Sequence, residues 1–261
     1  MLRVAYEGPL VVAHRGSSHA VPEHTLAAYQ QAIDEGADAV ECDVRLTRDG
    51  HLVCVHDRRV DRTSSGRGLV STLELAELSE LDFVSWRAEA GEVPDTDDNG
   101  VLTLARLLEL VLSASGRVTL HVETKHPTRY AGLVEQTLVR MLSGQGAIGG
   151  NSQVTVMSFA PLGLRRIRLL APELPTVLLI RSHTYGLWRE GILPSGVRIA
   201  GPSIDTVRRH PRFVSRVKAR GHRVHVWTVD DPADVDLVLD LGVDAIITNR
   251  PAEVLRRLGR V

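Results

Sequence analysis

The sequence predicts an α/β fold, a (β/α)₈ TIM barrel, and three observations support this prediction. The chain has 261 residues, of which 43% are hydrophobic, and barrels of this length commonly form one domain around a single core. Short β-branched runs alternate with longer segments of helical spacing, a pattern typical of parallel strands joined by crossover helices. The runs are apolar on both faces, as buried parallel strands are. An open, doubly wound sheet is the alternative that the same alternation allows.

The strand-like runs outnumber the strands of such a barrel by one. Nine runs have the pattern: Leu10–His14, Ala39–Val44, Leu52–His56, Val118–Glu123, Val154–Phe159, Thr176–Ile180, Val197–Ser203, Val224–Val229 and Val243–Thr248. Only Arg45–Gly50 separates the second run from the third, and Asp49-Gly50 is a hairpin signal. Because a parallel crossover needs a dozen or more residues, Leu52–His56 is expected to return antiparallel, and the other eight runs to form the barrel.

The segments between the strands have helical spacing, with one exception. The expected helices are Thr25–Glu35, Leu102–Leu112, Tyr130–Leu142, Leu162–Leu170, Phe213–Arg220, Ala233–Leu241 and Ala252–Leu258. From Asp57 to Gly100 the alternation stops, and two Gly-rich or polar stretches, Ser64–Gly68 and Pro94–Gly100, enclose a short helical pattern at Leu73–Leu81. Because ~40 residues are few for an independent core, we expect one domain over residues 1–261 with an insertion at about 57–100.

Composition excludes several classes of protein. Lys and Arg number 31 and Asp and Glu 32, so no basic field indicates nucleic acid, and the basic run Arg208–Arg212 is interpreted as a solvated loop. No signal-type stretch follows the N-terminus, and no run approaches the ~18 apolar residues that span a membrane. Cys42 and Cys54 are too few for a disulfide scaffold and fit a reducing compartment. We therefore expect a cytoplasmic protein without stable membrane insertion; its oligomeric state is left open.

Carboxylates on two strands predict a metal site. In Val40-Glu41-Cys42-Asp43-Val44, alternation places Glu41 and Asp43 on one face of an apolar strand, where two isolated charges are costly. A bound cation removes this cost, and hard oxygen ligands favour Mg²⁺ or Ca²⁺. Glu123, at the end of the next barrel strand, would be a third ligand. The alternative interpretation is that these acids pair with nearby basic residues.

Basic residues end the same strands. His14 and Arg15 follow the first strand, where arginine suits phosphate oxygens and histidine can move a proton near neutral pH. Lys125 shares a face with Glu123 and would neutralise phosphate charge. His121, one step deeper on that face, is interpreted as a packed core histidine. Alone, each cluster also fits a surface pair; together they predict phosphoryl chemistry at the carboxyl ends of the strands.

The position of His56 depends on the hairpin. A two-residue loop would set His56 across from Asp43, and a four-residue loop would set it across from Glu41, so either even register brings it beside the metal. The same parity puts Cys42 and Cys54 on opposite faces, which argues against a disulfide. An odd loop would reverse the faces.

These motifs resemble those of the glycerophosphodiester phosphodiesterases. His14-Arg15-Gly16 with Pro22-Glu23-His24-Thr25 is similar to the family's HRG…PENT signature, and the resemblance extends to about Pro251. Further matches are Glu41-Cys42-Asp43 with E-x-D, Thr47-Arg48-Asp49-Gly50 with T-x-D-G, Val55-His56-Asp57 with HD, Glu123-Thr124-Lys125 with E-x-K, Val226-Trp227-Thr228-Val229 with W-T-V and Gly242–Pro251 with G-x-D-x-I-x-T-x-x-P. His24 departs from the pattern, in which Asn stands at this position.

The resemblance implies a function and roles for the residues. It implies a barrel that hydrolyses glycerophosphodiesters, a small-molecule substrate, to glycerol 3-phosphate and an alcohol with Mg²⁺ or Ca²⁺. By resemblance, the metal ligands are Glu41, Asp43 and Glu123, the acid–base pair is His14 and His56, the phosphate-binding residues are Arg15 and Lys125, and Trp227 lines the glycerol side. For Trp227 a core aromatic is the alternative, and His24 is expected to support its loop. The alternatives for function are a lysophospholipid-type phosphodiesterase and a non-catalytic phosphate-ester-binding barrel.

Overall fold

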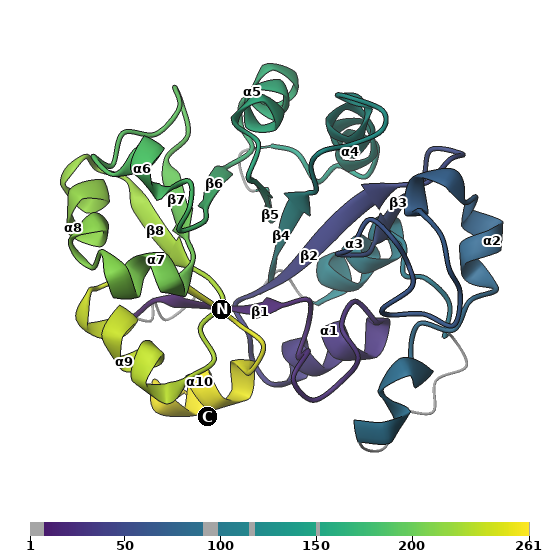
Figure 1. Cartoon of the computed structure of the whole chain (residues 1–261), viewed down its shortest axis with the longest axis horizontal. Helices are drawn as coiled ribbons and strands as arrows, with labels where there is room; N and C mark the ends of the chain where they lie inside the picture. The colour runs from purple at the N-terminus through teal and green to yellow at the C-terminus, as the bar shows by residue number, and fades with distance from the viewer. Residues whose placement is uncertain (1–7, 91–98, 115–117, 150–151, 261) are drawn as a thin grey trace.

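Eight parallel strands form a closed barrel in the computed structural model, which describes residues 8–90, 99–114, 118–149 and 152–260 (Figure 1). The strands are β1 (Leu10–His14), β2 (Ala39–Leu46), β3 (Leu52–Cys54), β4 (Thr119–Thr124), β5 (Val154–Ser158), β6 (Thr176–Ile180), β7 (Ile199–Pro202), β8 (Arg223–Val226) and β9 (Ala245–Thr248). All except β3 pair in parallel around the ring, and β1 pairs with both β2 and β9, which closes it. The predicted (β/α)₈ barrel is confirmed, and the open sheet is wrong because each of the eight strands pairs with a neighbour on both sides, which leaves no edge strand in the ring.

The register of β2 against β4 aligns the acidic positions. Asp43 pairs with Glu123, and Glu41 pairs with His121. Because side chains alternate along a strand, these four residues all point to the interior. Deeper inside, an apolar cluster with members from six strands fills the barrel, as the core of such a barrel requires.

Two histidines face each other in this interior. His121 on β4 and His225 on β8 come from opposite sides of the ring, and their rings stack with centroids 5.6 Å apart and an interplanar angle of 9°. Each residue is 2% exposed. Among the described residues, Nδ1 of His121 and both ring nitrogens of His225 have no hydrogen-bond partner. Burial lowers the pKa of His121 to about 4 and holds the pKa of His225 well below its ordinary value, so both rings are neutral near pH 7.

The β2–β3 hairpin is antiparallel, as predicted, but both even registers are wrong. Leu46 pairs with Leu52, and the loop between these two residues, from Thr47 to His51, has an odd number of residues. The loop has this length because the Thr47 hydroxyl donates to Asp49 and accepts from the His51 N–H, while Gly50 adopts a φ of +90°.

The odd register changes which residues share a face. Val44 pairs with Cys54, so Cys42 and Cys54 lie on the same face and join one apolar cluster, contrary to the expectation; both are free thiols. His56 does not take its place from the ladder, because β3 ends at Cys54. It reaches the barrel opening on the segment that follows the strand.

Helices surround the barrel and close its outer layer (Figure 1). They are α1 (Leu26–Asp34), α3 (Leu104–Ser113), α4 (Leu133–Gly144), α5 (Pro161–Leu170), α6 (Tyr185–Trp188), α7 (Ile204–Arg209), α8 (Arg212–Ala219), α9 (Pro232–Asp240) and α10 (Pro251–Arg257). The short α6 and α7 were not expected; Ser203 begins α7 by capping the N–H of Thr206. The basic run is not a loop, because Arg208 and Arg209 end α7 and Arg208 pairs with Asp234 of α9. No described helix is long and apolar enough to cross a bilayer.

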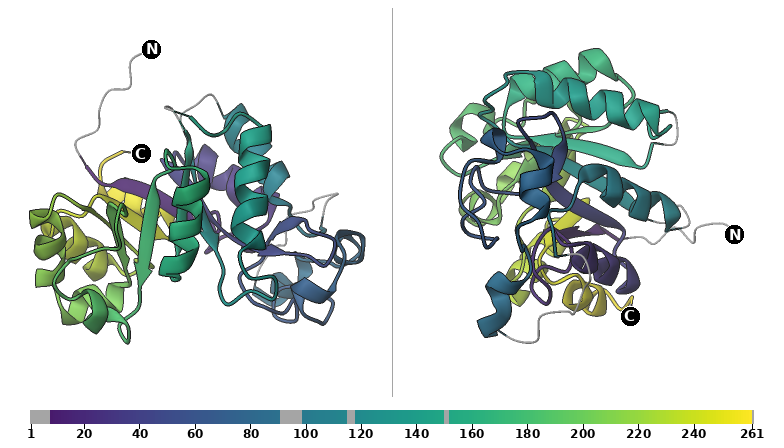
Figure 2. Two further views of the ribbon diagram at one scale, coloured as in Figure 1. Left: turned by 90° about the horizontal axis from the view of Figure 1, so that it is seen from above. Right: turned by 90° about the vertical axis from the view of Figure 1, so that its right-hand side faces the viewer.

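The segment between β3 and α3 leaves the barrel at the side of β2 (Figure 2). It contains η1 (Val70–Thr72), α2 (Leu75–Ser79) and η2 (Ser85–Ala90), and six of its buried residues form an apolar cluster with Val53 of β3. Arg87 of η2 donates to the carbonyl oxygens of Ser18, His19 and Val21, which attaches the segment to the β1–α1 loop. Most of the polar stretch Pro94–Gly100 and the first seven residues of the chain lie outside the described residues.

Candidate active site

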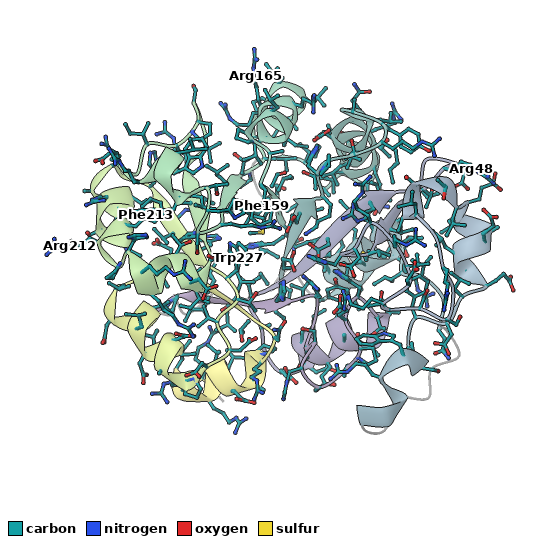
Figure 3. All side chains as sticks on the ribbon, in the orientation of Figure 1. Arg48, Phe159, Arg165, Arg212, Phe213 and Trp227 are labelled. Atoms are coloured by element: carbon teal, nitrogen blue, oxygen red, sulfur yellow. The ribbon has the colours of Figure 1, made fainter. Side chains whose placement is uncertain are left out.

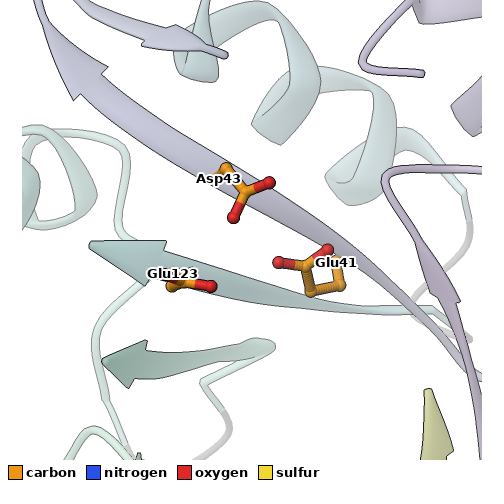
Figure 4. A group of neighbouring side chains, drawn as sticks. All are labelled: Glu41, Asp43 and Glu123. Carbon is orange, nitrogen blue, oxygen red and sulfur yellow. The ribbon is translucent and has the colours of Figure 1, made fainter. Parts of the chain in front are cut away.

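Three buried carboxylates meet where β2 and β4 approach the barrel opening (Figure 4). Glu41 and Asp43 extend from β2 towards Glu123 of β4, and one oxygen from each lies within 4.8 Å of the others. This is the one group of three metal-ligating side chains among the described residues. The spacing follows from the register, which puts Asp43 level with Glu123 on neighbouring strands.

The charges of the three acids respond differently to their surroundings. Burial and the neighbouring Asp43 raise the pKa of Glu41 well above its ordinary value, and the same two causes raise the pKa of Glu123 to about 7. Burial also acts upwards on Asp43, but Lys125 and Arg15 outweigh it and hold the pKa of Asp43 well below its usual range. Without a cation, protons thus partly neutralise the group. A set of hard oxygen donors of this kind fits a divalent metal ion.

Two cations hold Asp43 from both sides. Lys125 Nζ lies 3.1 Å from Oδ1 of Asp43 and 2.8 Å from Oε1 of Glu123, and Arg15 Nε lies 3.0 Å from Oδ2 of Asp43. Arg15 has a positive φ of 59°, which directs its side chain back over the barrel opening. Both cations therefore border the space above the acids, where a phosphate could receive their hydrogen bonds.

His14 at the end of β1 has a fixed tautomer. Its Nδ1 lies 2.7 Å from Oδ1 of Asn249, and the amide of Asn249 is oriented by its Nδ2, which donates to Asp230 at 2.6 Å. Because Oδ1 of Asn249 accepts, Nδ1 of His14 must donate, and Nε2 keeps its lone pair. Nε2 lies 4.0 Å from Glu41. Burial, followed by the charge of Arg15, lowers the pKa of His14 to about 4.

His56 has a charged partner instead. Its Nδ1 lies 2.7 Å from Oδ1 of Asp57, whose other oxygen accepts from Arg62 Nε at 2.7 Å. Burial lowers the pKa of His56 to about 4, although the carboxylates of Asp43 and Asp57 act upwards. The backbone is held by Arg45, which donates twice to the carbonyl oxygen of His56, at 3.0 and 2.7 Å.

Glu23 connects the two sides of the opening. Its carboxylate accepts from Arg15 at 3.0 Å and from both terminal nitrogens of Arg62, at 2.8 and 2.9 Å. Arg62 also lies over the Trp86 ring, 6.0 Å from its centroid. The insertion thereby supports Arg15 through Glu23 and His56 through Asp57. Trp86 is half-buried, and the guanidinium groups of Arg62 and Arg87 both lie over its ring.

His24 contacts the acids directly rather than only supporting its loop. Nε2 lies 3.0 Å from Oδ2 of Asp43, and Nδ1 lies 2.7 Å from the hydroxyl of Tyr29. The Tyr29 hydroxyl in turn donates to the carbonyl oxygen of Glu41 at 3.2 Å. A carboxylate oxygen only accepts, so Nε2 of His24 donates and helps to orient Asp43.

Aromatic residues line the opposite side of the opening. Trp227 follows β8, and its indole N–H donates to the Gly201 carbonyl oxygen at 2.6 Å. Phe159 meets the Trp227 ring edge to face at 5.4 Å, and the guanidinium of Arg181 lies 4.2 Å from the Phe159 ring centroid (Figure 3). Trp227 is half-buried and packs on the interior cluster, so it is both a core aromatic and a wall of the site.

The structure brings all eight predicted site residues to one opening, and it adds partners that the sequence left without a role. These are Asn249, Asp230, Asp57 and Arg62, which orient the two histidines, and Phe159, which joins Trp227. Asp57 and Asn249 lie inside the motifs matched in the sequence, and this position could have indicated that they support the site. No sequence pattern indicated a role for Arg62, because its partner Glu23 lies 39 residues away.

A closed parallel barrel with acids, histidines and cations at the carboxyl ends of its strands belongs to the class of barrel hydrolases that act on phosphate esters. Residues 14–253 match the model of the Glycerophosphoryl diester phosphodiesterase family. A probable glycerophosphodiester phosphodiesterase 1 of Mycobacterium tuberculosis is 49% identical over 247 residues, covering 93% of this chain and 90% of the relative. A glycerophosphodiester phosphodiesterase of Bacillus subtilis is 33% identical, covering 93% and 84%. The chain belongs to the glycerophosphoryl diester phosphodiesterase family, and the resemblance found in the sequence is confirmed.

Solved structures agree with this assignment. A phosphodiesterase of Oleispira antarctica, in complex with the product sn-glycerol-3-phosphate, superimposes with a TM-score of 0.79 at 26% identity, covering 96% of this chain and 97% of that one. A putative glycerophosphoryl diester phosphodiesterase of Silicibacter pomeroyi has the same fold, with a TM-score of 0.81 at 23% identity, and the match covers 96% and 93%.

Proposed function

We propose that this protein hydrolyses glycerophosphodiesters to sn-glycerol 3-phosphate and an alcohol with a divalent metal ion and two histidines. The observation that carries the proposal is the buried group of Glu41, Asp43 and Glu123 between His14 and His56, in a chain of this family. The product named for the Oleispira antarctica structure is consistent with this reaction.

The metal ligands in this proposal are Glu41, Asp43 and Glu123, and the preferred ion is Mg²⁺ or Ca²⁺. Burial and the repulsion among the three crowded carboxylates raise the pKa of Glu41 and of Glu123, and a bound hard cation would relieve this repulsion. When bound, the ion supplies electrostatic stabilisation of the charge on the phosphate oxygens. Arg15 and Lys125, which both contact Asp43, would bind the same phosphate, while Trp227 would border the glycerol.

The two histidines divide the proton transfers according to their partners. His14 donates through Nδ1 to a neutral amide, so Nε2 is available to take a proton from the attacking oxygen. His56 donates to the carboxylate of Asp57, which raises the pKa of His56 against the larger effect of burial, and an anionic phosphate bound beside the ring would raise it further. His56 therefore donates a proton to the oxygen of the leaving alcohol.

The proposal is tested with glycerophosphocholine and purified protein in Mg²⁺ or Ca²⁺, with and without chelator. Release of glycerol 3-phosphate that stops on chelation supports it, and no release in either metal for a panel of head groups contradicts it. His56→Ala should reduce turnover by ~10²–10⁴-fold, the range for a lost general acid or base. A matched control is His51→Ala, because His51 is exposed on the hairpin loop. Full activity of His56→Ala would remove His56 from the mechanism.

A second candidate is a lysophospholipid-type phosphodiesterase, and one observation favours it. An open groove of about 460 Å³ runs beside the site between the β4–α4 and β5–α5 loops, and its lining includes Phe159, Ala131 and Leu162. Leu162 is 63% exposed. An acyl chain would cover this apolar surface. Faster turnover of lysophosphatidylcholine than of glycerophosphocholine, reduced by Leu162→Ser, would support this candidate.

Two further parts of the proposal concern the protein as a whole. We propose that residues 1–261 form one phosphodiesterase domain with the insertion at about 57–100, supported by the contacts of Arg62 and Arg87 with the β1–α1 loop. We also propose a cytoplasmic role in lipid and glycerol metabolism, which cell fractionation and growth on glycerophosphodiesters would test.

A further inference from the structure

A second small pocket adjoins the site on the side of His56. It has a volume of about 30 Å³ and lies between the start of η1 and the β4–α4 loop. Lys125, which contacts Asp43 and Glu123, is also part of its lining, so the pocket borders the site already described. On the far side it is closed by the Tyr130 hydroxyl, which donates to the Ser71 carbonyl oxygen at 2.7 Å.

Three arginines surround this pocket, and each comes from a different element. Arg45 follows Asp43 on the inward face of β2, Arg58 comes from the insertion, and Arg129 from the β4–α4 loop. None of the three forms an ion pair with a carboxylate in the part of the chain that the structure describes. Arg45 donates to the backbone of His56, and Arg129 lies over the Tyr130 ring, 5.6 Å from its centroid.

The nearest acids do not balance these charges. Asp43 and Glu123 are already paired with Lys125, and Asp57 is paired with Arg62 and His56. Four cations around one pocket repel each other unless an anion joins them, and an arginine held without a carboxylate is free to bind a phosphate or carboxylate oxygen.

The size and the place of the pocket limit what it can accept. Its volume of about 30 Å³ leaves no room for a sugar ring or a choline group, but an oxygen of a phosphate or carboxylate group can enter it. Arg45, one of its lining residues, donates to the backbone carbonyl oxygen of His56, the residue assigned to protonate the leaving alcohol. A ligand that reaches it is therefore the charged tip of the alcohol, while the phosphate of the scissile bond stays over the three acids.

We propose that Arg45, Arg58 and Arg129 form a second anion-binding subsite, which selects diesters whose alcohol carries a further phosphate or carboxylate group. This inference rests on the proposed function, because it assigns the alcohol half of the same substrate. It names the substrate class as glycerophosphodiesters with an anionic alcohol, in preference to neutral or cationic ones.

A substrate series tests the subsite. We compare kcat/KM for glycerophosphoglycerol with kcat/KM for two analogues whose alcohol ends in a carboxylate or a phosphate. The wild type should favour at least one anionic analogue by tenfold or more, and 0.5 M salt should reduce this preference. Arg58→Gln/Arg129→Gln should lower kcat/KM for that analogue about tenfold, mainly through KM, and leave glycerophosphoglycerol within twofold. Equal kcat/KM values of the wild type for all three substrates would overturn the subsite. An equal loss of kcat/KM on all three substrates in the double variant would overturn it as well.

Two controls separate this inference from the proposed function. Arg165→Gln removes an exposed arginine of α5 and should keep the wild-type preference (Figure 3). Binding without turnover is measured by calorimetry in Ca²⁺ with 3-hydroxypropyl phosphate and propane-1,3-diol bisphosphate, whose carbon chain stands for the alcohol half of the substrate. The wild type should bind the bisphosphate about tenfold more tightly, and the double variant should bind both equally. Equal affinity in the wild type would overturn the subsite even if diesters are hydrolysed, whereas tighter bisphosphate binding without hydrolysis would overturn the proposed function alone.

Discussion

The stacked pair of His121 and His225 should make the protein lose stability in mild acid, and His121→Leu should remove part of this loss. Leucine has a similar volume and would join the apolar cluster around the pair. It cannot take up a proton, and it removes the buried Nδ1 that has no hydrogen-bond partner among the described residues. The perturbation therefore isolates one titrating group in the interior of the barrel.

The magnitude follows from the pKa of His121. Burial lowers this pKa from 6.5 to about 4, so the unfolded chain binds a proton at pH values where the folded chain does not. Above pH 6.5 the titration of His121 does not reduce the free energy of unfolding. As the pH falls from 6.5 towards 4, the free energy of unfolding decreases progressively, because only the unfolded chain takes up the proton. At pH 5 the lost free energy of unfolding is roughly 2 kcal/mol, and it reaches about 3.4 kcal/mol below pH 4.

Urea unfolding at pH 7.5 and pH 5.0 measures this difference. Excess EDTA is present throughout, so that loss of a metal ion in acid does not contribute. The wild type should lose about 2 kcal/mol more between the two pH values than His121→Leu does. His225→Leu should change the pH dependence in the same direction, because the pKa of His225 is also lowered by burial. Parallel stability curves for wild type and His121→Leu would refute the reasoning.

Two further predictions concern the support of the site. Arg62→Gln should lower kcat/KM for glycerophosphocholine about tenfold, the scale of one hydrogen bond to a charged group, because Glu23 and Asp57 lose a shared donor. The control Arg59→Gln, at a neighbouring arginine, should leave kcat/KM unchanged. Equal values of kcat/KM for the two variants would contradict the role of Arg62. Gly16→Ala should destabilise the fold by about 1–3 kcal/mol, because Gly16 has a φ of +85° and a Cβ there would lie 2.6 Å from the backbone of Ala28. A midpoint in urea equal to that of the wild type would contradict it.

Much of the fold followed from local pattern, since alternating strands and helices indicate a barrel without knowledge of distant contacts. The hairpin register did not, because it was set by the side chain of Thr47, which bonds across its own turn, and not by the number of residues that Asp49-Gly50 suggests. The short helices α6 and α7 were missed because four and six residues give too little periodicity to recognise.

The candidate site also contains some residues that local pattern predicts and others that it does not. Glu41 and Asp43 were predicted to share a face from strand parity, which fixes the direction of a side chain inside a strand, and Glu123 was predicted from its place at the end of the next barrel strand. Two contacts that support the candidate site join distant segments: Asn249 is 235 residues from His14, and Arg62 is 39 residues from Glu23. The sequence pattern does not indicate such pairs, so the predicted site residues could be named from the sequence but Asn249 and Arg62 could not be assigned to them.

The bond between His14 and Asn249 joins the first strand of the barrel to the residue after the last one. Because of this bond, the order in which the chain is synthesised determines when His14 can be oriented. A growing chain acquires the acids of β2 and β4 when less than half of it has been made, but His14 obtains its orienting partner only after β9 has emerged and closed the ring. Metal affinity and catalysis should therefore appear at different chain lengths, and a nascent or truncated barrel that already holds an ion would have an imidazole free to turn away from its substrate.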